Sequence, residues 1–222
     1  MTETTERLST LGPFFALSDA MRAGTWCPLR ELRDTPVLDD RVDYAVRFLS
    51  ERAGAPVERR IAASTMSFAL FARLLSPLMG AAALGYRLPA LDWDSTLWQP
   101  VNTGPWPLAL TGPETEPSPE AGLHEVVLPL AEVLSRRYSL SLHVLTGNIT
   151  SAVFSAARLI GRARPGFARD ALDLAMALLD GPLAGAGTLI SPVDVEFVRN
   201  SCCLYYRVPG ADYCGECILQ PR

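Results

Sequence analysis

Four of the five cysteines lie close together near the end of the chain. Cys202 and Cys203 are adjacent, ten residues follow, and two residues separate Cys214 from Cys217. Four thiolates on one short loop are a typical ligand set for a metal ion or an iron–sulfur cluster. The Cys-x-x-Cys spacing directs two sulfurs to one metal, and the intervening Pro-Gly pair predicts a turn that folds the second pair onto the first. We therefore expect these four cysteines to bind metal.

The adjacent pair Cys202 and Cys203 limits how the thiols can be arranged. Neighbouring side chains of an extended strand point to opposite faces, so both can bind one compact cluster only if the backbone kinks there. Structural zinc also takes four thiolates, but usually with about two to four residues between paired ligands. A disulfide would require an oxidising compartment. From the spacing alone, an iron–sulfur cluster and zinc both stay open.

The residues around these cysteines carry a further signal. The segment from Ser201 to Arg207 reads Ser-Cys-Cys-Leu-Tyr-Tyr-Arg, and the segment ending at Cys217 reads Cys-Gly-Glu-Cys. Both resemble the C-terminus of the FhuF-like ferric-siderophore reductases, with weaker similarity at Phe71–Pro77 and at the Gly-Asn pair of positions 147 and 148. The resemblance implies a 2Fe–2S cluster bound by the four tail cysteines, and an enzyme that reduces ferric siderophores by one electron and releases ferrous iron for cellular use.

The expected partners follow from this resemblance and from what the sequence lacks. The sequence contains no Gly-rich phosphate loop and no dinucleotide fingerprint, so we expect a separate electron donor, such as a ferredoxin or a flavoprotein reductase. The ferric siderophore is the expected substrate. Two alternatives stay open: a zinc- or cluster-stabilised interaction module, and a siderophore-biosynthesis module without reductase activity.

Candidate substrate-binding residues lie beside the first cysteine pair. Arg199 and Arg207 flank it and could attract an anionic chelate or an acidic partner. Tyr205 and Tyr206 could pack over the cluster and contact the chelate. The other arginines of the segment 158–169 are predicted to form a solvated face.

The remaining sequence predicts an α+β fold that is predominantly helical, with about five helices and a small antiparallel sheet. The apolar spacing predicts helices at residues 39–53, 57–75, 123–138, 142–160 and 167–179. Pro77 is expected to bend or end the second helix, and residues 96–99 and 106–110 predict a hairpin. Residues 1–36 are expected to be irregular, and residues 185–192 a loop before the cysteine segment.

The chain has 222 residues, 49% of them apolar, which is enough to bury one good core. A Pro/Glu-rich loop predicts a boundary between an N-terminal part with the hairpin, residues 1–113, and a C-terminal helical part with the cluster loop, residues 123–222. The two could also pack as one compact domain.

Charge and hydropathy indicate which classes of partner and which cellular location to expect. The net charge of −4 does not suggest a nucleic-acid partner. Arg73 and Pro77 interrupt the apolar tract of residues 61–84, so we expect a buried helix and no integral membrane segment. Arg73 is expected to be structural, held by a buried carboxylate or carbonyl. With no secretory signal visible, we expect a cytoplasmic protein. Cys27 stands apart beside Trp26 and is predicted to pack rather than to bind metal.

Overall fold

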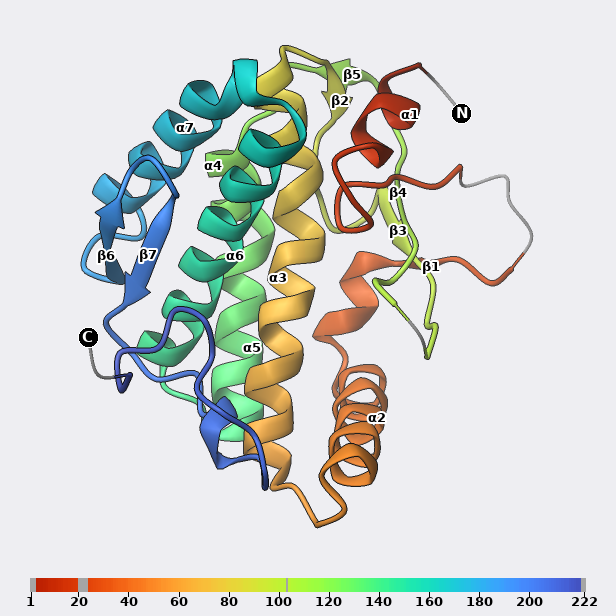
Figure 1. The fold of residues 1–222 in the computed structure, drawn as a ribbon. Coiled ribbons are helices and arrows are strands. Elements are labelled where there is room, and N and C mark those ends of the chain that lie inside the picture. The colour runs from red at the N-terminus through yellow and green to blue at the C-terminus, as the bar shows by residue number, and fades with distance from the viewer. Residues whose placement is uncertain (1–2, 20–23, 103, 221–222) are drawn as a thin grey trace.

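Two long helices form the centre of the fold. In the computed structural model, which describes residues 3–19, 24–102 and 104–220, α3 (Arg59–Leu84) packs along α6 (Leu142–Ala163). Helices α2 (Thr35–Ala53), α5 (Leu128–Tyr138) and α7 (Ala168–Asp180) surround this pair, as Figure 1 shows. The predicted α+β, predominantly helical fold is confirmed, and all five predicted helices are present.

Helix α3 is longer than the sequence predicts, and this corrects the expected end at Pro77. The helix continues without interruption to Leu84, and Gly85, with φ 71°, ends it in the left-handed conformation. A proline inside a helix costs about 3 kcal/mol. Pro77 is buried together with most of the second half of α3, so the packing of this core helix outweighs the local penalty.

By length and composition alone, α3 could cross a membrane. Its most apolar window is 78% buried inside the fold, however. Such burial is what a core helix shows, because a helix surrounded by lipid would expose that surface.

Arg73 lies in the middle of α3 and is 4% exposed. Its guanidinium donates to the carbonyl oxygens of Trp106 at 2.5 Å, Phe14 at 2.9 Å and Ala16 at 2.6 Å. Burial lowers its pKa to about 10, which leaves it charged at neutral pH. The prediction of a structural arginine held by a buried carboxylate or carbonyl is confirmed, with carbonyls as the partners, because Arg73 fastens two distant loops to α3.

The helix boundaries follow local signals. Gly54, with φ 62°, ends α2 as predicted, and the Ser141 hydroxyl accepts the amide N–H of Val144 at the start of α6. The run that ends in α5 begins earlier than predicted, with the short α4 (Pro119–Gly122) and a π-helical turn, Leu123–Val127. Short 3₁₀ turns cover Leu29–Arg33, Pro165–Phe167 and Tyr205–Arg207.

The opening segment is more ordered than predicted. It contains α1 (Glu3–Ser9), whose seven residues are too few for a clear helical period. Leu8 of this helix packs against Gly80 of α3, where an added Cβ would lie 3.0 Å from the Leu8 side chain. Residues 1–2 and 20–23 of the predicted irregular segment lie outside the described residues.

The strands form small antiparallel sheets. β3 (Thr96–Trp98) pairs with β4 (Leu108–Leu110), which confirms the predicted hairpin, and β1 (Cys27–Pro28) adds a strand to its edge. β2 (Leu88–Pro89) pairs with β5 (Glu114–Thr115). The predicted loop at 185–192 is wrong, because β6 (Gly187–Ser191) pairs there with β7 (Glu196–Arg199).

The β6–β7 hairpin matters for the site because it leads directly into the cysteine segment. β7 packs on α6, and the ring of Phe197 stacks on that of Phe154 with centroids 4.4 Å apart. One hydrophobic cluster includes Leu8, Phe71, Phe154 and Phe197, so it draws on both the N-terminal and the C-terminal part of the chain.

Candidate metal centre

The cysteine segment is held close to the two central helices. An added Cβ at Gly147 of α6 would lie 2.2 Å from the Ser201 hydroxyl oxygen, so any larger residue here would force the Ser201 side chain to shift. Ser64 of α3 donates its hydroxyl to the Cys203 carbonyl at 2.8 Å. The backbone N–H of Arg199 donates to the Glu216 carbonyl at 3.3 Å. The segment is thus fixed to both helices and closed on itself.

The backbone kink that adjacent cysteine ligands require lies directly after them. Leu204 has φ 68° and ψ 0°, and the 3₁₀ turn Tyr205–Arg207 follows. At this kink the N–H of Leu204 points at the Cys202 sulfur at 3.3 Å, and the N–H of Leu219 points at the Cys217 sulfur at the same distance. Amide donors to sulfur are a usual feature around iron–sulfur clusters, whose potentials they help to set.

Two of the thiols already stand at ligand spacing. The sulfurs of Cys203 and Cys214 are 3.3 Å apart, while a disulfide would need about 2.05 Å. Bonds of about 2.3 Å from one tetrahedral metal would place two sulfurs roughly 3.7 Å apart. All five cysteines are free thiols. The spacing therefore suits two ligands of one metal and does not suit a covalent bond.

The other two tail thiols belong to the same neighbourhood. Burial raises the pKa of Cys202, and the nearby Cys203 and Cys217 raise it further. In the part of the chain that the structure describes, no group of three or more His, Cys, Asp or Glu side chains is arranged around a single ion. A 2Fe–2S cluster instead takes four thiolates shared between two irons, and the residues fit that donor set, with one thiol pair in place and amide donors on the other two sulfurs.

A buried cation lies beside these thiols. Arg199 is 3% exposed and donates to the Asn148 Oδ1 at 2.6 Å and to the Ser151 hydroxyl oxygen at 2.6 Å. The hydrogen bond from Cys214 lowers the pKa of Cys203, and the charge of Arg199 lowers it further against the opposing effect of burial. The same bond raises the pKa of Cys214, which keeps the shared proton. The electrostatics therefore favour negative charge on Cys203, while the pKa values of Cys202 and Cys214 are raised.

The Gly-Asn pair of α6 takes part in the site mainly through the hydrogen bonds of Asn148. Its amide group donates to the Ser64 carbonyl at 2.9 Å and to the Ser67 hydroxyl at 2.8 Å, while its oxygen accepts from Arg199. Gly147 makes room for the tail and Asn148 links α3, α6 and Arg199. This pair was noticed in the sequence only through the weak resemblance.

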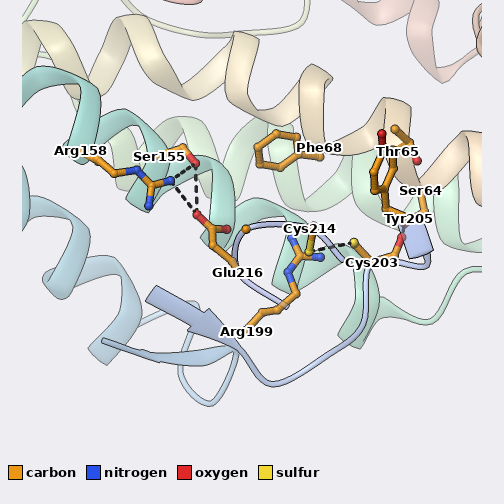
Figure 2. Close-up of a pocket in the computed structure, with 11 residues that line it drawn as sticks. Ser64, Thr65, Phe68, Ser155, Arg158, Arg199, Cys203, Tyr205, Cys214 and Glu216 are labelled. Carbon is orange, nitrogen blue, oxygen red and sulfur yellow. Dashed lines mark hydrogen bonds and ion pairs between the residues drawn. The ribbon is translucent and has the colours of Figure 1, made fainter. Parts of the chain in front are cut away.

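An open pocket of about 330 Å³ lies against the cysteine loop. Figure 2 shows the Cys203–Cys214 pair on one side, the Arg158–Glu216 pair on the other, and Phe68 between them. The pocket is lined by residues of α3, of α6 and of the tail: Ser64, Thr65, Phe68, Ser155, Arg158, Arg199, Cys203, Tyr205, Cys214, Gly215 and Glu216. Two of the candidate ligands therefore face a space that another molecule can enter.

Arg158 was predicted to belong to a solvated face, and the structure corrects this. Its Nη2 lies 3.0 Å from Oε1 of Glu216, a carboxylate that is mostly buried between Cys214 and Cys217. Arg158 and Glu216 thus fasten the Cys-x-x-Cys segment to α6. Sequence reasoning missed Glu216 as well as Phe68. The position of Glu216 between two cysteines was an available signal, but its partner depends on tertiary packing.

The predicted substrate-binding residues lie in different surroundings. Tyr205 lines the pocket, whereas the ring of Tyr206 lies 6.4 Å from that of Tyr213 and is not part of the lining. Arg207 is on the surface, 3.4 Å from Glu58. Arg199 is interior rather than surface-exposed. Contact of these four residues with a chelate stays a prediction.

Cys27, predicted not to be a ligand, lies in β1 and pairs with Trp98 across the sheet. Figure 1 places this sheet on the other side of α3 from the cysteine loop. Its position agrees with the interpretation that Cys27 packs rather than binds metal.

The cysteine loop matches the model of a known protein family. Residues 199–217 match the family model described as the FhuF 2Fe-2S C-terminal domain, a stretch that contains all four tail cysteines. The match supports an iron–sulfur, siderophore-related protein and is consistent with an FhuF-like family. No curated protein matches the chain.

Proposed function

We propose that the chain binds a 2Fe–2S cluster through Cys202, Cys203, Cys214 and Cys217 and reduces ferric siderophores by one electron. The observation that carries this proposal is the family match over a loop that places two of these cysteines against an open pocket. We also propose that the reaction takes place in the cytoplasm, where the released ferrous iron is used.

The chemistry requires little beyond the cofactor. Held by the four tail cysteines, such a cluster would supply one electron at a time, which balances the reduction of one ferric ion to ferrous. Ferrous iron is held poorly by the hard oxygen ligands of a siderophore, so reduction is also release. A separate donor of the ferredoxin or flavoprotein-reductase class restores the electron. No side-chain acid or base is needed for this reaction.

The chain's own residues hold the site and control access to it. Cys203 and Cys217 are buried, which limits water near the sulfurs, while Cys214 is partly exposed at the pocket. Phe68 and Tyr205 offer aromatic surface to the body of a chelate, and Arg158 with Glu216 offers a polar edge. The pocket of about 330 Å³ would admit part of a large chelate and bring its iron toward the loop.

The test is an anaerobic single-turnover reaction. The reduced protein, freed of excess reductant, is mixed with hydroxamate, catecholate and mixed ferric chelates in the presence of a ferrous trap. The proposal expects reoxidation of the cluster and about one ferrous ion per cluster. A cluster that stays reduced against the whole panel contradicts the reductase function and favours an electron carrier or sensor.

A pair of variants tests the pocket in the same reaction. Thr65 lines the pocket, whereas Ala69 lies one turn further along α3, outside this pocket and exposed. Thr65→Phe should slow cluster reoxidation by chelates at least about tenfold by filling the space, which corresponds to about 1.4 kcal/mol. Ala69→Phe adds similar bulk and should leave the rate unchanged. Equal rates for the two variants would mean that chelates do not use this pocket.

A further inference from the structure

Arg199 is a buried charge without an anionic side-chain partner. It is 3% exposed, and its three hydrogen bonds go to Asn148 and Ser151, which are both neutral. Among the described residues, no carboxylate forms an ion pair with it. Burying an uncompensated cation is expensive, so a native structure normally supplies negative charge nearby.

The nearest source of negative charge is the cysteine loop. Arg199 lines the same pocket as Cys203 and Cys214, and Figure 2 shows its side chain extending from the end of β7 toward Cys214. Of the five N–H donors of a guanidinium, the bonds to Asn148 and Ser151 use three. Four metal-bound thiolates together with the cluster sulfides carry net negative charge, and reduction adds one more negative charge.

We infer that Arg199 is the fixed counter-charge of the iron–sulfur cluster, held in place by Asn148 and Ser151, and that it raises the reduction potential of the cluster by stabilising its reduced form. Net charge and hydrogen bonding near the sulfurs are among the factors that set such potentials. The inference rests on the proposed cluster but not on the proposed reduction of siderophores. It gives Arg199 a role different from docking an anionic chelate.

The two roles predict different effects of salt and substrate. A docking arginine on the surface would act on the rate with anionic chelates, and salt would screen it. A buried counter-charge acts on the cluster itself with no chelate present, and salt screens it less than a surface charge because Arg199 is out of solvent. The decisive quantity is therefore the reduction potential of the protein alone.

The experiment is spectroelectrochemical titration of the anaerobically purified protein and three variants, at low and high salt. Arg199→Gln removes the charge and keeps hydrogen-bonding groups. Arg199→Lys keeps the charge and loses the planar fork. Ser151→Ala removes two of the three hydrogen bonds of Arg199, but it keeps the charge of Arg199 and its bond to Asn148. Ser151→Ala is thus the matched control for a purely structural role.

The inference expects Arg199→Gln to be harder to reduce by at least about tenfold in the equilibrium constant, or about 59 mV for a one-electron couple, at both salt concentrations. Arg199→Lys and Ser151→Ala should stay near the wild-type potential. If Arg199→Gln retains no cluster while Arg199→Lys does, the need for the charge is shown directly.

Three results would overturn the inference: a wild-type potential in Arg199→Gln, an equal shift in Arg199→Gln and Arg199→Lys, or loss of the cluster from both. Each would mean that the site does not use the charge of Arg199. Absence of a cluster from the wild-type protein would instead contradict the proposed function.

Discussion

Among the residues that the structure describes, two arginines are buried, and they lie in regions that use a buried charge differently. Arg73 is 4% exposed and Arg199 is 3% exposed, and within the described residues neither forms an ion pair with a carboxylate. Arg73 sits among loops of the N-terminal half, whereas Arg199 ends β7 beside the cysteine loop. Burial alone therefore does not reveal what such a residue does.

The groups around each guanidinium make the difference. Arg73 is bonded by three backbone carbonyls, whose dipoles compensate its charge and which belong to loops that need fixing. Arg199 is bonded by side chains of one helix, and the groups that can balance its charge are thiolates. In this protein, the carbonyl acceptors of Arg73 fit a structural role, whereas the neutral acceptors of Arg199 beside the cysteines fit the electrostatic role inferred above.

The largest expected effect on stability lies at Arg73. Arg73→Leu would leave three partly buried carbonyl oxygens without their donor, at about 1–3 kcal/mol each, and should lower the free energy of unfolding by about 3–5 kcal/mol in urea titrations. The reduction potential of any variant that still binds the cluster should stay at the wild-type value. A loss below about 1 kcal/mol, or a shifted potential, would remove the contrast between the two arginines.

The next effect lies under the tail, at Gly147. Alanine in place of a helical glycine usually stabilises by about 0.5–1 kcal/mol, but here the added Cβ would lie 2.2 Å from the Ser201 hydroxyl oxygen. Gly147→Ala should therefore destabilise the fold by about 1–3 kcal/mol and weaken cluster retention. Thermal or urea unfolding and iron content measure both.

Two controls sharpen this prediction. The Ser201 hydroxyl has no hydrogen-bond partner among the described residues, so Ser201→Ala should be tolerated and should rescue most of the Gly147→Ala defect in the double variant. Gly166→Ala, where an added Cβ meets nothing within 4 Å, should change stability by less than about 0.5 kcal/mol. An unchanged defect in the double variant would mean that the tail does not approach α6 as described.

A smaller effect is expected at the Arg158–Glu216 pair. Because Arg158 is partly exposed, solvent screens the interaction, and Arg158→Gln should cost about 1–2 kcal/mol of stability and speed the loss of iron to a chelator. Arg169→Gln breaks an exposed i,i+4 pair with Asp173 and should cost less than about 0.5 kcal/mol. Equal iron loss from the two variants would show that the pair does not hold the Cys-x-x-Cys segment.

The sequence predicts the parts of this molecule that depend on local signals. Helix periodicity, the stop at Gly54 and the clustering of the four tail cysteines are all readable from short segments. Helix α3 passes through Pro77 because long-range packing overrides a local breaker. The β6–β7 hairpin was missed because no residue of β6 is buried and two of its five residues are exposed.

In the candidate site, too, some features follow from local sequence and others depend on long-range packing. The cysteines are visible in the sequence, but the groups that position and balance them come from helices far along the chain. In the sequence Arg158 resembles the other arginines of its segment, and only the fold shows its ion pair with Glu216. In the sequence Arg199 resembles a docking residue, and only the fold shows that it is buried and bonded to Asn148 and Ser151. These contacts join residues about fifty to sixty positions apart and leave no local pattern.

The central claim is the cluster on the four tail cysteines, and one measurement tests it most directly. Iron, sulfide and zinc contents are determined for the anaerobically purified protein, and electron paramagnetic resonance spectra are recorded after reduction. The account predicts about two irons per chain and one paramagnetic signal, both lost or altered when Cys202, Cys203, Cys214 or Cys217 is changed to Ser and both kept in Cys27→Ser. A colourless protein with about one zinc per chain, or an unchanged signal in the Cys202→Ser and Cys203→Ser variants, would contradict it.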